Sequence, residues 1–201
     1  MKTALLIRHG ATAGNLEKRY IGRTDEPLCP LGISQAEALR PRLPVPDRIY
    51  VSPMHRTRET ASILFPGREL IPAEELRETD FGDFEGKTAD ELSHSADYRA
   101  WVDGWCLGPI PGGEAVSDFR ARCAEAFPRL MEAAPEGVTA FVIHGGVIMA
   151  ILAALGEPRK DFYEWYLPNC GCWTCRWEEG VLRPEAQALP PMGFPCGPDR
   201  E

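Results

Sequence analysis

The sequence has no surplus of positive charge, because 30 Asp and Glu residues outnumber 22 Lys and Arg residues. A net charge of −8 argues against nucleic acid or an anionic membrane as the main partner. Long hydrophobic runs are also lacking: no stretch approaches a transmembrane span, and the apolar run near the N-terminus is too short for a signal peptide. We therefore expect a cytoplasmic protein that binds neither membrane nor nucleic acid.

The sequence also lacks a nucleotide-binding motif and a linker between domains. The Gly-x-x-x-x-Gly-Lys loop of nucleotide-binding phosphoryl enzymes is absent. No linker divides the chain, and 201 residues with 44% hydrophobic content suffice for one domain, residues 1–201, with a substantial core. Cysteine occurs in an odd number, seven, and without a secretion signal we expect reduced thiols.

The rest of the chain is organised around the apolar run Ala4–Ile7, which is typical of a strand buried on both faces. Arg8, His9 and a glycine follow it directly. A second apolar run, residues 140–143, ends in the same way on His144 and two glycines. In open α/β sheets, binding sites form where strands end. If the two strands are parallel neighbours, His9 and His144 face one another across one pocket.

Hydrophobic periodicity predicts an α/β fold, a three-layer sandwich with a mostly parallel central sheet and helices on both faces. Residues 86–113 form a small helical lid insertion, and the tail from Pro190 is loosely ordered. Pro41 weakens the last turn of one helix, and Pro128 kinks another or ends it early. The expected strands are Ala4–Ile7, Arg48–Val51, Glu69–Ile71, Val138–Ile143, Cys170–Trp177 and Val181–Pro184. The expected helices are Ile33–Leu43, Arg56–Leu64, Thr88–Leu92, Ala96–Trp105, Val116–Ala134 and Gly146–Leu155.

Four segments of the chain share a further pattern: Arg8–Thr12 with Asn15, Ser52–Ala61, Leu76–Gly86 and His144–Gly146. In this order they resemble the motifs of the histidine phosphatase superfamily, also called the phosphoglycerate-mutase-like family. The resemblance extends from Lys2 to Arg183. Within it, Asn15–Leu28 is most similar to α-ribazole phosphatase-type enzymes, and the same pattern occurs in broad-specificity sugar-phosphate phosphatases.

The residue types in these segments suit phosphoryl transfer, which needs positive charge, an in-line nucleophile and a proton for the leaving oxygen. Arg8 and Arg56 can bind phosphate with bidentate geometry. Asn15 can donate a side-chain N–H to a phosphate oxygen. His9 is the expected nucleophile, which forms a phosphohistidine that water then hydrolyses. His144 precedes a predicted helix N-terminus, where backbone N–H groups favour an anion.

The resemblance assigns the general acid to Glu78, with Asp80 as the fallback. A carboxyl group close to a phosphate has a raised pKa, as a general acid requires. Gly22 and Arg23 lie in the loop that faces the substrate in the resembling family, although a surface role for Arg23 is an equal alternative. We expect no metal and no cofactor, because the arginines supply the charge that Mg²⁺ supplies elsewhere.

The lid predicts the kind of substrate. It offers only Lys87 and Arg99 as cations, whereas the resembling mutases carry more basic residues to hold a carboxylate. Aromatic rings suit a flat, weakly charged leaving group, and an equal alternative is that some of them only pack the lid onto the body. We therefore expect a phosphomonoesterase for a small phosphorylated metabolite such as α-ribazole 5′-phosphate, as a monomer or homodimer. The aromatic residues are Phe81, Phe84, Tyr98, Trp101 and Trp105.

Two other functions remain open. A phosphoglycerate mutase would use the same core residues for isomerisation. A non-catalytic or zinc-binding module could be built on Cys170, Cys172, Cys175 and Cys196. Strand alternation argues against zinc, because it places Cys170 and Cys172 on one face and Cys175 on the other, which favours a packing role.

Overall fold

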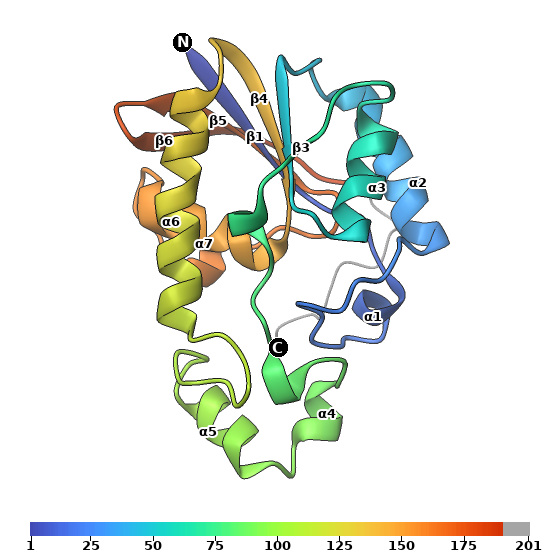
Figure 1. Cartoon of the computed structure of the whole chain (residues 1–201), viewed down its shortest axis with the longest axis vertical. Helices are drawn as coiled ribbons and strands as arrows, with labels where there is room; N and C mark the ends of the chain where they lie inside the picture. Colours follow the sequence, from blue (N-terminus) through green and yellow to red (C-terminus); the bar gives the residue numbers. More distant parts are fainter. Residues whose placement is uncertain (191–201) are drawn as a thin grey trace.

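A computed structural model describes residues 1–190, and its centre is a six-stranded sheet (Figure 1). The strand order is β3-β2-β4-β1-β5-β6. Strands β3, β2, β4 and β1 run parallel, whereas β5 and β6 are antiparallel to their neighbours. The predicted mixed, mostly parallel sheet is therefore confirmed. The strands are β1 (Lys2–Arg8), β2 (Arg48–Val51), β3 (Ile71–Pro72), β4 (Gly137–Ile143), β5 (Cys172–Glu178) and β6 (Val181–Ala188).

Successive residues of the central strands point into two hydrophobic cores, one on each face of the sheet. Leu5 and Ile7 of β1 pack with α2 and α3, whereas Leu6 packs with α6 and α7. These three layers match the predicted sandwich and explain why β1 is apolar at consecutive positions. The helices are α1 (Ala13–Leu16), α2 (Pro30–Leu39), α3 (His55–Leu64), α4 (Ala89–Leu92), α5 (Ala96–Asp103), α6 (Val116–Ala133) and α7 (Gly145–Leu155).

Helix α6 corrects the expectation for Pro128. The helix continues through this proline to Ala133, so the predicted early end is wrong. Phe127 and Met131, on the two sides of the proline, are completely buried in the core. Their packing holds both turns in place and outweighs the loss of one backbone hydrogen bond.

Smaller differences affect the ends of other elements. Helix α2 begins at Pro30, three residues before the predicted start, since proline is favourable in the first turn. Arg40–Arg42 forms a separate 3₁₀ turn in place of the predicted last helical turn. Strand β5 begins at Cys172 because Cys170 has a left-handed φ of 55°, which strand geometry excludes. The segment Glu74–Gly86, predicted to be a loop, contains two 3₁₀ turns.

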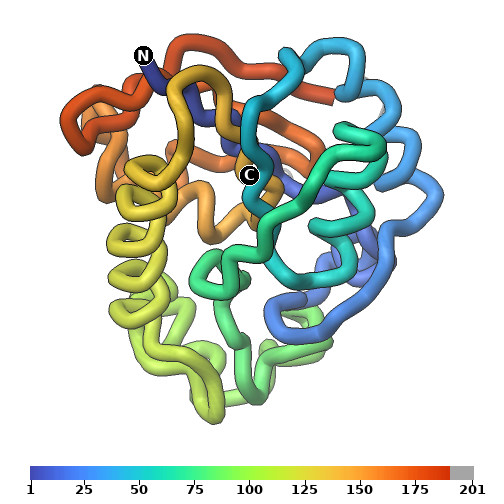
Figure 2. The backbone as a smooth tube through the Cα atoms, turned by 45° about the horizontal axis from the view of Figure 1, so that its top comes forward, coloured from blue at the N-terminus to red at the C-terminus, as the bar shows by residue number. Residues whose placement is uncertain are grey.

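The segment 86–113 holds α4 and α5, which lie together at one end of the molecule, beyond the carboxyl ends of β1 and β4 (Figure 1). Figure 2 shows the same grouping after a 45° turn. A core of its own joins this lid to the preceding segment, and its buried members are Phe84, Leu92, Tyr98, Trp101 and Ile110. Within residues 1–190, no helix is long and apolar enough to cross a membrane. The predicted loose tail lies outside the described residues, apart from Pro190.

Candidate active site

The two histidines meet because their strands are parallel neighbours. Arg8 at the end of β1 is paired with Ile143 at the end of β4, so His9 and His144 are each the next residue. The His9 amide donates a hydrogen bond to the Ile143 carbonyl at 3.0 Å. The centroids of the two imidazole rings are 5.2 Å apart, at an interplanar angle of 67°. The predicted placement of both histidines in one site is confirmed.

The position of the proton on His9 follows from its contact with Gly10. Its Nδ1 lies 2.7 Å from the Gly10 carbonyl oxygen, which can only accept, so Nδ1 carries the proton. The lone pair of the neutral ring is therefore on Nε2. Burial lowers the pKa of His9 well below its usual range, and the charges of Arg56 and Arg8 lower it further. The ring is thus neutral at neutral pH.

His144 is the N-cap residue of α7, and its ring is completely buried. Its Nε2 lies 2.7 Å from the Ser52 hydroxyl oxygen, while Nδ1 has no hydrogen-bond partner in the described structure. Burial, followed by the charge of Arg56 and contact with His9, lowers the pKa of His144 well below its usual range. The following amides of α7 start a helix, where the backbone favours an anion.

Arg56 and Arg8 bring fixed positive charge to the histidines. Arg56 is fully buried, and its two Nη atoms each donate a 2.8 Å hydrogen bond, to the carbonyls of Thr24 and Gly22. Arg8 donates through Nη1 to the Leu167 carbonyl at 2.7 Å. The Nε–H groups of both arginines are buried and have no partner among the described residues. Each guanidinium is therefore anchored by the protein and retains a donor for an anion.

Glu78 lies against the start of α7, beside the histidines. Its Oε2 accepts from the Gly146 amide and its Oε1 from the Thr79 amide, both at 3.1 Å. Burial raises the pKa of Glu78, against the opposing effects of these two hydrogen bonds and of nearby arginines. The fallback residue Asp80 instead accepts from the Gly82 amide at 2.8 Å and pairs with Arg23. The geometry therefore favours Glu78 over Asp80 as the acid.

Asn15 is tied to the loop that carries His9. Its Oδ1 accepts from the Thr12 amide at 3.2 Å and from the Asn169 amide group at 3.0 Å. The same Asn169 nitrogen donates to the His9 carbonyl at 3.1 Å. Because Oδ1 accepts both bonds, it orients the Asn15 side chain and leaves its NH₂ group without a partner among residues 1–190.

Gly22 and Arg23 occupy different surroundings. Gly22 supplies the carbonyl that holds Arg56, and its amide donates to Glu85 at 2.7 Å. A Cβ at this position would lie 1.8 Å from the Thr79 carbonyl oxygen, so only glycine fits. Arg23 is exposed and borders a charged pocket of about 270 Å³ that also reaches Glu78.

An aromatic pocket of about 210 Å³ opens beside Glu78 and Gly146. Of the five predicted lid aromatics, only Phe81 and Trp101 line it. Phe84 and Tyr98 are instead buried in the core of the lid, and the Trp105 side chain is 81% exposed. Phe84 and Tyr98 thus follow the packing alternative, and Trp105 does neither. The remaining rings that line the pocket are Tyr20, Phe119, Phe162 and Tyr163.

Several supporting residues were not singled out from the sequence. Ser52, the partner of His144, and Glu85, the partner of Gly22, lie inside the matched motifs, and that position could have identified them. Arg122 donates to the Glu78 carbonyl at 3.1 Å and to Glu114, and so holds the segment that carries the acid. Asn169 lies in no motif, and only the fold brings it to Asn15 and His9.

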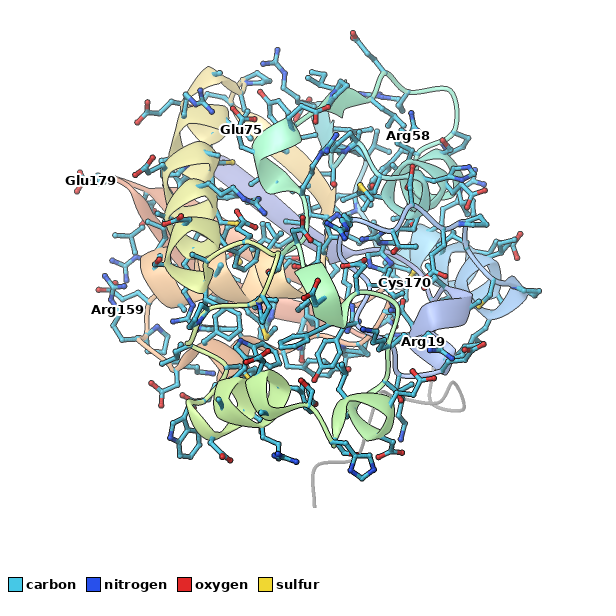
Figure 3. All side chains as sticks on the ribbon, turned by 60° about the horizontal axis from the view of Figure 1, so that its bottom comes forward. Arg19, Arg58, Glu75, Arg159, Cys170 and Glu179 are labelled. Atoms are coloured by element: carbon cyan, nitrogen blue, oxygen red, sulfur yellow. The ribbon has the colours of Figure 1, made fainter. Side chains whose placement is uncertain are left out.

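The cysteines follow the predicted alternation. Cys170 and Cys172 belong to one hydrophobic core and Cys175 to the other, on the opposite face of the sheet. Cys170 lies in the interior (Figure 3), where its amide donates to the carbonyls of Arg8 and His9. Within the described chain, no three His, Cys, Asp or Glu side chains gather as metal ligands. Cys196 lies outside the described residues.

The sheet thus carries two facing histidines and two anchored arginines at its carboxyl edge, an arrangement suited to binding a phosphate group. The model of the family described as "Histidine phosphatase superfamily (branch 1)" matches residues 4–188. The chain therefore belongs to the histidine phosphatase superfamily, as the motifs predicted, and is a phosphatase enzyme.

Relatives of known name carry different activities. The chain is 32% identical over 179 residues to the adenosylcobalamin/alpha-ribazole phosphatase of Salmonella typhimurium, covering 84% of this chain and 87% of the relative. It is 31% identical to a "Probable phosphoglycerate mutase GpmB" of an Enterobacter species, covering 89% and 86%. The crystal structure of the alpha-ribazole phosphatase from Shigella flexneri superposes with a TM-score of 0.83 at 27% identity, covering 91% and 94%.

Proposed function

We propose that the protein hydrolyses a small phosphorylated metabolite, a phosphomonoester, through a covalent phosphohistidine on His9. One observation carries the proposal: the Gly10 carbonyl holds the proton of His9 on Nδ1, which leaves the Nε2 lone pair free to attack. Arg8 and Arg56 lie close enough to depress the pKa of this ring, and each retains a buried donor for phosphate oxygens.

In the first step, Nε2 of His9 attacks phosphorus, and a P–N bond forms as the bond to the leaving oxygen breaks. Arg8 and Arg56 stabilise the equatorial oxygens. Protonated Glu78 gives its proton to the leaving alkoxide, so the alcohol departs neutral. His9 then carries the phosphoryl group and Glu78 is a carboxylate.

In the second step, water attacks the phosphoryl group of phospho-His9. The Glu78 carboxylate takes a proton from this water as the O–P bond forms and the P–N bond breaks. Inorganic phosphate leaves, His9 returns to its neutral form and Glu78 is protonated again. His144, at the N-terminus of α7, stabilises phosphate oxygens in both steps, and Asn15 can donate to one of them through its NH₂ group. Neither step uses a metal or a cofactor.

The aromatic pocket beside Glu78 supports a substrate with a flat, largely apolar leaving group. α-Ribazole 5′-phosphate is the first candidate, because relatives with the same motifs are named for it. The lid cations do not border this pocket: Lys87 donates to the Asp83 carbonyl and Arg99 to the Ser93 carbonyl. Neither lid cation is therefore placed to hold a substrate carboxylate in this pocket, although Arg120 of α6 does border it.

A substrate panel tests the proposal. Phosphate release is measured from α-ribazole 5′-phosphate, phenyl phosphate and both phosphoglycerates, and isomerisation is measured after priming with bisphosphoglycerate. We expect phosphate release to dominate, with the aromatic esters preferred. Efficient conversion of 3-phosphoglycerate to 2-phosphoglycerate, with little free phosphate, would establish the mutase instead.

The nucleophile is tested by His9→Ala, which should abolish turnover and the acid-labile phosphoprotein trapped by rapid quench. Losing the covalent step raises the barrier by several kcal/mol. His94→Ala, at an exposed lid histidine, is the matched control and should behave like the parent. Trapped phosphate on His144, or turnover by His9→Ala within about tenfold of the parent, would contradict the assignment.

A further inference from the structure

Arg120 is a cation on the wall of the aromatic pocket. It lies on α6, one residue after Phe119, and both residues border the pocket together with Glu78. Its guanidinium carbon is 4.4 Å from the centroid of the Phe162 ring, within the range of a cation–π contact. The guanidinium is thus packed against one aromatic wall of the pocket.

The surroundings of Arg120 differ from those of its neighbour Arg122. Arg122 is paired with Glu114 at 2.6 Å and donates to backbone carbonyls that include that of Glu78. Arg120 makes no ion pair with any carboxylate in residues 1–190, and its buried Nε–H has no acceptor there. A buried donor without a partner is costly, and native structures keep few of them.

Phosphate is not the natural partner of Arg120, because other arginines serve that site. The charges of Arg56 and Arg8 lower the pKa of His9, and the buried Nε–H groups of both arginines have no partner among residues 1–190 and can donate to an anion there. Arg120 instead shares its pocket with rings and with the acid Glu78. Since Glu78 protonates the leaving oxygen, this pocket holds the leaving group.

We propose that Arg120 determines substrate specificity by binding a hydrogen-bond acceptor on the leaving group. The substrate class is a phosphomonoester whose leaving group contains a flat aromatic ring with such an acceptor, and a carboxylate is the strongest acceptor. The inference rests on the proposed phosphatase function, which places the leaving group beside Glu78. The aromatic side chains that line the pocket contact the ring of the leaving group, and the guanidinium of Arg120 donates hydrogen bonds to its acceptor.

Two substrates of similar shape test this role. 4-Carboxyphenyl phosphate offers Arg120 an anion, whereas 4-methylphenyl phosphate offers none. Arg120→Met should lower kcat/KM for the carboxyl ester about tenfold or more and change that for the methyl ester by less than about twofold. Arg120→Lys, which keeps the charge without the fork, should fall between parent and Arg120→Met. Arg99→Met, at an exposed lid arginine, should change neither. Equal losses on both esters would overturn the inference and leave the phosphatase assignment intact.

A binding measurement keeps the inference testable without turnover. Calorimetry on the parent and Arg120→Met compares the product analogues 4-hydroxybenzoate and 4-methylphenol. The variant should bind 4-hydroxybenzoate about tenfold or more weakly and 4-methylphenol as the parent does. Unchanged affinity for 4-hydroxybenzoate would overturn the role of Arg120. Absence of phosphate release from every ester by the parent would instead refute the proposed function.

Discussion

Gly22→Ala should disable the site by displacing Arg56 and the backbone that carries Glu78. The new Cβ would lie 1.8 Å from the Thr79 carbonyl oxygen, whereas ordinary contacts begin at 3.4 Å. The two backbone segments must therefore separate by 1.6 Å (3.4 − 1.8). Gly22 moves with its carbonyl, which accepts the 2.8 Å hydrogen bond from Arg56, and Thr79 moves with the backbone that carries Glu78.

A displacement of that size is large for a catalytic site, since misplacing a group by 1 Å costs on the order of a hundredfold in rate. We expect kcat/KM for phenyl phosphate to fall about a hundredfold and the affinity for inorganic phosphate to weaken. Overpacking should also lower the free energy of unfolding by about 1–3 kcal/mol. Steady-state kinetics, phosphate calorimetry and denaturant titration measure the three quantities.

Gly108→Ala is the matched control, because a Cβ there meets no atom within 4 Å. This variant lies in the lid segment and should keep the parental kinetics and stability. A folded Gly22→Ala enzyme with kcat/KM within about twofold of the parent would refute the reasoning. It would mean that the hydrogen bond from Arg56 to the Gly22 carbonyl is not needed to position Arg56.

Three further predictions concern the charges of the site. Glu78→Gln should abolish most activity and raise the free energy of unfolding at pH 7. Because the pKa of Glu78 is raised in the folded state, its carboxyl group favours folding below the ordinary pKa of 4.5, and this advantage is lost as pH rises through the folded pKa. At pH 7 the buried carboxylate therefore costs stability that a glutamine does not. Denaturant titrations should show the gain shrinking toward pH 4.5, and an equal gain at all pH values would refute the argument. Ser52→Ala removes the partner of His144 and should lower kcat about tenfold with little change in KM; rescue by Ser52→Thr would support a hydrogen-bonding role. Activity should survive excess EDTA, because Arg8 and Arg56 supply the charge stabilisation, and a loss restored only by Mg²⁺ or Zn²⁺ would contradict the mechanism.

The meeting of His9 and His144 could be predicted because the signal of each histidine is local. Each is preceded by a buried strand and followed by glycine, and parallel neighbouring strands bring such positions together without further information. Arg56 was predictable from the motif Ser52–Ala61, and it lies in the first turn of α3, the helix that follows β2. The sequence could thus identify the carboxyl edge of the sheet as the site.

The supports of these residues could not be predicted, because they depend on contacts between distant segments. Asn169 bonds Asn15 across 154 positions, and no pattern near either residue indicates the pairing. The aromatic residues of the lid show the same limit. Composition identified the rings, but the fold decides that Phe81 and Trp101 line the pocket while Phe84 does not. Pro128 likewise follows the packing of α6 and not its own local preference.

Glu78 shows how the two halves of the site depend on one another. An acid for the first step needs a raised pKa, and burial beside the aromatic pocket is the largest influence on this carboxyl group. A base for the second step needs a carboxylate that is not too unstable. The amides of Thr79 and Gly146 and the charges of Arg56 and Arg8 stabilise that anion. Since the two proposed steps make opposite demands on one group, the aromatic pocket and the charged phosphate site must meet at Glu78.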